Sequence, residues 1–278
     1  MKIRFIAVLA LPVLLAVPAR AQTVGEILVI DWRDAGKDVL SVWASPFDAS
    51  RRDWLIAGAA FAVTGVSMLV DQPVSDWAIR NQDAAAFRAI SPLRRGGVLF
   101  AGEYVVPPIA LAYVAGVVFN NQGVRDFVTG CAASWAANSY LRKVSYRLVG
   151  RLRPDSVPDD PHQWGGPGSG DDWMMRSFPG GHVANAMACA SYWNHRFEWG
   201  AGEPALYAVA TAVGIGRLAD EAHWFSDTVI GGVLGYAIGK EVARRSLSRR
   251  DAPSALQTSS MYMHPEAGGV TFGMRWTF

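Results

Sequence analysis

Apolar and polar residues follow one another along this chain in long blocks, with no residue-by-residue alternation over most of its length. Six apolar runs therefore predict helices and not strands. They cover residues 54–70, 97–119, 126–149, 183–197, 204–217 and 225–245. Ala and Gly are dense in these runs, and Gly231, Gly235 and Gly239 recur at every fourth position, which would let a second helix approach closely. The pattern predicts an all-α fold, a tightly packed six-helix bundle over residues 54–245.

The N-terminus has the pattern of an export signal. Cations near the start precede a charge-free stretch, residues 5–17, and the small residues Ala19 and Ala21 follow it. This order predicts a secretory signal peptide over residues 1–21, with an uncleaved membrane anchor as the alternative. Residues 22–53 come next as a polar N-terminal extension. We expect an exported protein of the cell envelope.

The C-terminal tail, residues 246–278, differs from the helical block. Apolar residues recur at alternate positions from Val270 to Phe278, and this period of two predicts a short β-hairpin. Within the block, only 54–70 and 104–124 approach the roughly 20 apolar residues that a membrane-spanning helix needs. We therefore expect a bundle that does not cross the membrane, either periplasmic or resting against a bilayer surface.

Composition adds two points. The chain is 51% hydrophobic with a formal net charge of +2, and the absence of a basic block argues against a nucleic-acid partner. Cys131 and Cys189 could pair in an oxidising compartment, or both could remain buried thiols within apolar helices. The sequence leaves this choice open.

Three short polar clusters lie where predicted helices start or stop. They are Arg151-Leu152-Arg153-Pro154, Phe178-Pro179-Gly180-Gly181-His182, and Arg217 with His223 and Asp227. Arginine binds phosphate through a planar fork of donors, and glycines at a helix start let backbone N–H groups approach an anion. A histidine with a carboxylate four residues later can act as a nucleophile, and a second histidine can protonate a leaving oxygen. Because the ends of antiparallel neighbours meet on one side, the clusters predict a single site that holds and cleaves a phosphate ester.

A long segment between the third and fourth predicted helices, residues 154–177, is rich in Pro, Gly and Asp. Loops of this length inside a domain are more often functional than idle. We interpret it as a lid or substrate-selecting loop, with a solvated connection as the alternative.

The clusters resemble the motifs of the type 2 phosphatidic acid phosphatase superfamily, which includes bacterial nonspecific acid phosphatases and vanadium haloperoxidases. Its pattern is Lys-x6-Arg-Pro, then Pro-Ser-Gly-His, then Ser-Arg-x5-His-x3-Asp. The matching residues are Arg153-Pro154; Pro179, Gly181 and His182; and Arg217, His223 and Asp227. The resemblance implies that His223 is the nucleophile, forming a phosphohistidine, and that Asp227 orients it. It further implies that His182 is the acid, that Arg153 and Arg217 clamp the phosphoryl oxygens, and that no metal or cofactor is needed.

Three positions depart from this pattern. Tyr146 stands in the Lys slot, and Gly180 and Gly216 each replace a Ser. Lys143 and Arg147 are the candidate stand-ins for the missing Lys, and neither aligns cleanly with it. Lys143 is one helical turn too far back and Arg147 is about 100° off around the helix.

The sequence thus predicts a metal-independent phosphatase that hydrolyses a phosphomonoester or pyrophosphate. Its expected partner is a phosphorylated lipid, a lipid-linked headgroup or a small phosphate ester. Two alternatives remain: a catalytically degenerate phosphate-binding protein of the envelope, suggested by the three departures, and a vanadate-dependent haloperoxidase that uses the same pocket.

Overall fold

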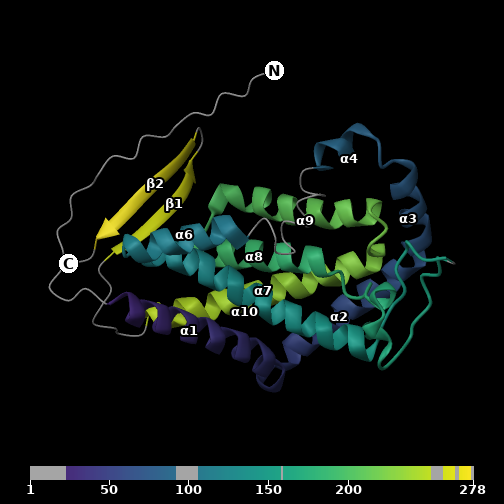
Figure 1. Ribbon diagram of the computed structural model, residues 1–278, viewed down its shortest axis with the longest axis horizontal. Helices are drawn as coiled ribbons and strands as arrows, with labels where there is room; N and C mark the ends of the chain where they lie inside the picture. Colours follow the sequence, from purple (N-terminus) through teal and green to yellow (C-terminus); the bar gives the residue numbers. More distant parts are fainter. Residues whose placement is uncertain (1–22, 92–105, 158, 252–258, 267–268, 277–278) are drawn as a thin grey trace.

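A computed structural model describes residues 23–91, 106–157, 159–251, 259–266 and 269–276 (Figure 1). Its helices are α1 (Val24–Ala44), α2 (Arg51–Ser67), α3 (Asp71–Arg80), α4 (Ala85–Ala89), α6 (Val106–Val118), α7 (Gln122–Leu148), α8 (Gly181–Phe197), α9 (Glu203–Ala219) and α10 (Phe225–Asp251). The predicted signal peptide and part of the predicted run 97–119 lie outside the described residues. The chain is mostly helical, as expected, and α6 to α10 run side by side along the long axis in Figure 1.

The expected count of six helices is wrong, because α1, α3 and α4 add to the predicted runs within the described part of the chain. The segment expected to be a polar extension forms α1, which begins with a capping box between Thr23 and Glu26. In the middle of α1, Asp31 accepts a hydrogen bond from Arg125 of α7 at 2.9 Å, and both side chains are almost buried. The polar residues of α1 thus serve to fix it against the bundle.

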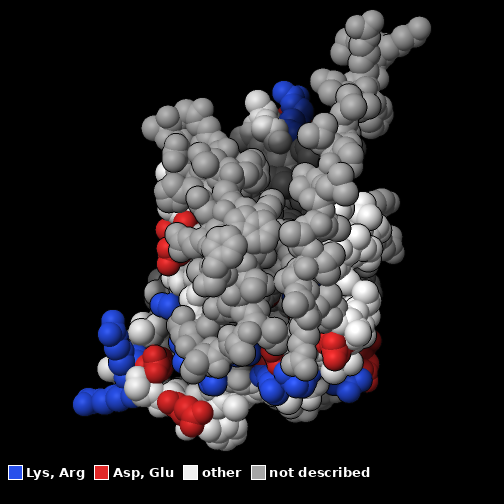
Figure 2. Space-filling view, turned by 90° about the vertical axis from the view of Figure 1, so that its left-hand side faces the viewer, with Lys and Arg blue, Asp and Glu red and all other residues white. Residues whose placement is uncertain are grey.

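A second set of ion pairs joins α1 to α10. Arg249 pairs with Asp38, which is buried, and lies 3.8 Å from Asp34. Burial raises the pKa of Asp38, and the Arg249 guanidinium opposes that shift. Charged side chains gather along the lower edge of the face in Figure 2, at the height where α1 and the C-terminal part of α10 lie in Figure 1.

The core is built on close contact between α8 and α10. A Cβ added at Gly235 or Gly239 of α10 would collide with a backbone carbonyl of α8. One added at Gly231 would collide with the carbonyl of Gly180, the residue just before α8. The partners at Gly235 and Gly239 are Ala184 and Ala188, both fully buried. The small-residue stripe therefore brings the two backbones together as the sequence predicted.

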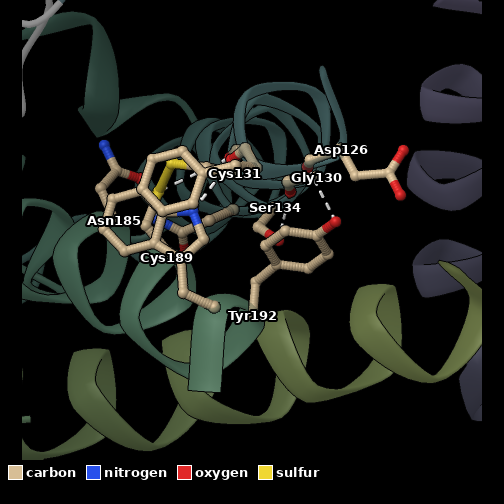
Figure 3. The surroundings of a disulfide bond; sticks show 10 residues. Asp126, Gly130, Cys131, Ser134, Asn185, Cys189 and Tyr192 are labelled. Carbon is tan, nitrogen blue, oxygen red and sulfur yellow. Dashed lines mark hydrogen bonds between the residues drawn. A yellow bond between two sulfur atoms is a disulfide. The ribbon is translucent and has the colours of Figure 1, made fainter. Parts of the chain in front are cut away.

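A disulfide bond joins α7 to α8 beside this core (Figure 3). Cys131 and Cys189 lie 4.6 Å apart at their Cα atoms, and neither is a free thiol. One turn along α8, the Tyr192 ring occupies the space over Gly130, and its hydroxyl donates to the Asp126 carbonyl at 2.8 Å. Of the two states that the sequence left open for the cysteines, the structure has the bridge.

One helical stretch in the described part of the chain, Arg51–Arg80, is long and apolar enough to cross a membrane. It comprises α2, a short 3₁₀ turn and α3, and only 11% of its most apolar window is buried. Large apolar side chains such as Trp54, Phe61 and Leu69 are exposed on it. The stretch therefore offers an apolar surface, although length and composition alone do not establish a membrane span.

Near the C-terminus, β1 (Ser259–Glu266) pairs antiparallel with β2 (Gly269–Trp276), with Ser259 opposite Trp276. In Figure 1 the two strands lie at the opposite end of the molecule from α3. Backbone contacts link β1 to α7 and to the short turn Gly200–Gly202. The strands are thus remote from the helix ends that carry the polar clusters.

Candidate active site

The three polar clusters come together at one end of the bundle, where α7 and α9 end and α8 and α10 begin. His182 is the second residue of α8, and His223 lies just before α10. The centroids of the two imidazole rings are 5.8 Å apart. Arg153 and Arg217 lie close enough for their charges to lower the pKa of both imidazoles. Four of the predicted side chains therefore lie close together at this end of the bundle.

His223 is held in a defined tautomer. Its ring is 2% exposed, and Nδ1 lies 2.8 Å from the backbone carbonyl of Ser177. Because a carbonyl oxygen only accepts hydrogen bonds, Nδ1 carries the proton and Nε2 carries the lone pair. Nε2 is buried and has no hydrogen-bond partner among the described residues. Such a nitrogen is available to attack an electrophile.

Asp227 supports this ring differently from what the sequence predicted. Its carboxylate accepts hydrogen bonds from the Ser177 hydroxyl at 2.5 Å, the Trp224 backbone N–H at 3.0 Å and Arg151 at 2.6 Å. The hydrogen bond at Nδ1 of His223 goes to Ser177, so among the described contacts Asp227 reaches the ring through that residue. Burial raises the pKa of Asp227, and Arg151 and Ser177 oppose the shift.

Arg151 belongs to this supporting network. Its guanidinium is fully buried and donates to Asp71 at 2.7 Å, to Asp227, and to the Pro161 carbonyl at 2.6 Å. Asp71 also accepts from the backbone N–H and hydroxyl of Ser226. With its donors committed to two carboxylates, Arg151 is not available to a phosphate, although it belongs to one of the three polar clusters that predicted the phosphate site.

Arg153, two residues along the chain, lacks this compensation. The Nε atom of Arg153 is buried without a hydrogen-bond partner in the described structure, and burial lowers the pKa of its guanidinium. The Trp173 ring of the 154–177 loop covers it, with the ring centroid 4.1 Å from Cζ. Arg217 is partly buried and pairs with Asp220 at 2.8 Å. A buried site with more cations than carboxylates favours an anionic ligand.

The imidazoles are neutral in this environment. Burial is the main cause that lowers the pKa of His182 to about 3, and three arginine charges add to it. These belong to Arg217, Arg142 and Arg153. Burial and the positive surroundings likewise hold the pKa of His223 well below its ordinary value. A bound dianion would offset these charges and raise both pKa values again.

The two glycines before His182 lie close to groups of α7 and α10. A Cβ at Gly180 would lie 2.8 Å from the Asp227 carbonyl oxygen of α10, so the backbone leaves little room for the Ser of the expected motif. A Cβ at Gly181 would lie 2.5 Å from Cδ of Arg142. Both glycines thus bring backbone to the site, and the first turn of α8 offers N–H groups that have no partner within the helix.

Neither stand-in for the missing Lys is near this space. Lys143 is exposed, and Arg147 is exposed and lies 3.9 Å from Asp171 of the loop. The sequence analysis did not consider Arg142, which lies beside Gly181, as a stand-in for the missing Lys. Its spacing of four residues from Tyr146 places it on the same helix face, and that spacing was the available signal.

The 154–177 loop is tied to the site by backbone hydrogen bonds. Arg151 and Arg153 donate to the Met175 and Met174 carbonyls, each at 2.9 Å. Asp155 donates at 3.2 Å to the Glu221 carbonyl, which follows α9. The loop is therefore an ordered wall of the site that carries Trp173.

A model of the PAP2 superfamily matches residues 127–250, which include all three clusters. Residues 127–250 belong to the PAP2 superfamily. Over 95 residues the chain is 34% identical to a lipid A 1-phosphatase from Porphyromonas gingivalis. That alignment covers 33% of this chain and 17% of that protein, so the chain spans a small part of this relative. A crystal structure described as the first transmembrane PAP2 type phosphatidylglycerolphosphate phosphatase, from Bacillus subtilis, aligns with a TM-score of 0.46 at 16% identity, covering 71% of this chain and 98% of that one.

Proposed function

We propose that this PAP2 protein is a phosphatase that hydrolyses a phosphomonoester or pyrophosphate through a phosphohistidine at His223. The observation that carries the proposal is the buried, unpartnered Nε2 of His223, whose other nitrogen is fixed by the Ser177 carbonyl. It lies beside a second imidazole and a cluster of arginines. A nucleophile needs such a free lone pair, and a phosphoryl group needs such cations.

In the first step, the Nε2 lone pair attacks phosphorus and the bond from phosphorus to the leaving oxygen breaks. The electron pair goes to that oxygen, which takes a proton from His182. The bound phosphate charge raises the pKa of His182, so the imidazole is protonated in the complex although it is neutral in the empty site. Arg153 and Arg217 bind the phosphoryl oxygens, and Nδ1 of His223 keeps its proton, which it donates in a hydrogen bond to the Ser177 carbonyl.

In the second step, water attacks the phosphorus of the phosphohistidine and gives a proton to His182. The P–N bond breaks and its electron pair returns to Nε2. Both nitrogens of His223 are then as they began, and inorganic phosphate leaves. Each step uses only side chains of this chain and water.

We propose that the reaction needs no metal ion. The described residues contain no group of three or more His, Cys, Asp and Glu side chains arranged to hold one. The charged side chains around the two imidazoles are arginines, and the Asp227 carboxylate behind them is already bonded to Arg151. Arginine and backbone N–H groups stabilise developing negative charge without a metal.

We further propose a substrate whose phosphate is part of a lipid headgroup. The exposed apolar stretch formed by α2 and α3 passes Asp71, which bonds to Arg151 and so joins the network behind the site. A bilayer against this surface would place headgroup phosphates near the helix ends that hold the imidazoles. The similarity of 95 residues of this chain to a lipid A 1-phosphatase agrees with this class.

The test is phosphate release by the purified full chain from p-nitrophenyl phosphate, phosphatidic acid, lipid A and a prenyl pyrophosphate. We expect turnover that resists EDTA, is inhibited by vanadate, and is lost in His223→Gln. His195→Gln is the matched control, because His195 lies far along α8, bonded to the Ser191 carbonyl. Equal activity of wild type and His223→Gln would refute the proposal. Phosphate binding without turnover would instead support a degenerate binding protein, and peroxide-dependent bromide oxidation with vanadate a haloperoxidase.

A further inference from the structure

Arg142 of α7 is a cation without a carboxylate partner in the described structure. It is partly buried, and its Nε atom has no hydrogen-bond partner there. The three most buried arginines of the described bundle are paired: Arg125 with Asp31, Arg196 with Asp126, and Arg151 with two aspartates. An arginine that serves only the fold is expected to have such a partner, because an uncompensated charge away from water is costly.

The Arg142 side chain lies against the start of α8. A Cβ added at Gly181 would be 2.5 Å from Cδ and 3.1 Å from Cζ of Arg142, so a larger residue at this position would displace the Arg142 side chain. Gly181 is the first residue of α8 and directly precedes His182. The guanidinium is therefore beside the helix turn whose N–H groups and dipole favour an anion.

Tyr146 holds this guanidinium in place. Cζ of Arg142 lies 5.9 Å from the centroid of the Tyr146 ring, within the range of a cation–π interaction. The Tyr146 hydroxyl donates to the Pro179 carbonyl at 3.4 Å, which ties the ring to the same glycine-containing segment. Burial raises the pKa of Tyr146, so the phenol is neutral.

We propose that Arg142 binds the phosphoryl oxygens of the substrate as the third arginine of the site, with Tyr146 as the ring that positions it. The proposal rests on the proposed phosphatase function. It accounts for a site that has Tyr where a Lys was expected, because the cation comes from one turn earlier on the same face of α7. The exposed Lys143 and Arg147 take no part.

The experiment compares Arg142→Gln, Arg142→Met and Arg142→Lys with two controls on the same helix, Lys143→Gln and Arg147→Gln. For each full-length protein, kcat/KM with p-nitrophenyl phosphate and the inhibition constant of inorganic phosphate are measured, together with the thermal unfolding midpoint. We expect both neutral variants to lose about 10²-fold in kcat/KM and to bind phosphate at least about tenfold more weakly. Arg142→Lys should recover part of both, and the controls should match wild type.

The unfolding midpoint separates this binding role from a purely structural one. If Arg142 binds phosphate, removal of its unpaired charge should leave the unfolding midpoint of the phosphate-free protein unchanged or higher. Added phosphate should then raise the midpoint of the neutral variants less than that of wild type. The proposal would be overturned if the neutral variants kept wild-type kcat/KM and phosphate inhibition and His223→Gln still abolished turnover. Unfolding of both neutral variants would assign Arg142 to the fold and would also overturn it. Loss of the proposed function itself would appear separately, as an inactive wild type.

Discussion

Arg151 and Arg153 are two residues apart, and the structure gives them opposite roles. The guanidinium of Arg151 is fully buried between Asp71 and Asp227, both also fully buried. Arg153 has no such pair and lies at the site under Trp173. Replacement of each should therefore change a different property: Arg151→Met should reduce stability, and Arg153→Gln should reduce activity.

The expected loss of stability in Arg151→Met follows from what the substitution leaves behind. Methionine is shorter and has no donors, so two carboxylates lose their common partner, and the Pro161 carbonyl loses two hydrogen bonds. Breaking a buried ion pair by removing one partner costs about 3–5 kcal/mol. Asp227 keeps the Ser177 hydroxyl and the Trp224 N–H, and Asp71 keeps Ser226, so we expect a value of about 4 kcal/mol and not twice the cost of one pair.

The assay is equilibrium urea unfolding of both variants and wild type, with phosphatase activity measured on the fraction that remains folded. Arg151→Met should unfold at a much lower urea concentration than wild type, because the expected loss of about 4 kcal/mol is a large part of the roughly 5–15 kcal/mol by which a typical folded protein is stable. Arg153→Gln should unfold like wild type but lose about 10²–10³-fold in kcat. An Arg151→Met protein within about 1 kcal/mol of wild type would refute the buried-pair reasoning, as would an Arg153→Gln protein with full activity.

Three further predictions follow from the site and its supports. The folded-state pKa of His182 is about 3, so the unfolded chain binds more protons than the folded chain between about pH 3 and about pH 6.5. The free energy of unfolding should therefore fall as the pH drops through that window. Between about pH 4 and about pH 8, the thermal unfolding midpoint of His182→Gln should depend less steeply on pH than that of wild type. Replacing both Cys131 and Cys189 by Ser should cost about 4 kcal/mol from the chain entropy of a 58-residue separation, measured by urea unfolding, and reductant should destabilise only the wild type. Gly181→Ala should displace the Arg142 side chain and weaken phosphate inhibition about tenfold, with no loss in the unfolding midpoint because Ala favours the helix; unchanged inhibition would contradict the placement of Arg142.

The sequence predicted the features that depend on local pattern. The apolar runs predicted α2, α7, α8, α9 and α10, although α10 extends beyond its predicted end at residue 245 to Asp251, and the glycine stripe of α10 predicted its close approach to α8. The polar clusters at helix ends predicted that His182 and His223 lie together, and their rings are 5.8 Å apart. These inferences needed only periodicity and the geometry of antiparallel neighbours.

What the sequence could not predict depends on contacts between distant residues. Asp71 lies 80 positions from Arg151, and no local signal indicates that it shares a guanidinium with Asp227. The α1 helix is polar enough to resemble a solvated extension, yet Asp31 and Asp38 are held by arginines of α7 and α10. The pairing of the cysteines likewise required the relative positions of α7 and α8.

Some arginines at this end of the bundle are paired with carboxylates of this chain, and others are not. The sequence does not distinguish an arginine that stabilises the fold from one that binds a ligand. In the structure the partner of each buried arginine makes this distinction, because a guanidinium away from water needs a negative charge beside it. Arg151 meets two aspartates from this chain. Arg153 and Arg142 meet aromatic rings and leave buried Nε atoms without a partner in the described structure. Under the proposed function, a phosphoryl group beside the Nε2 atom of His223 would supply the negative charge that these arginines lack.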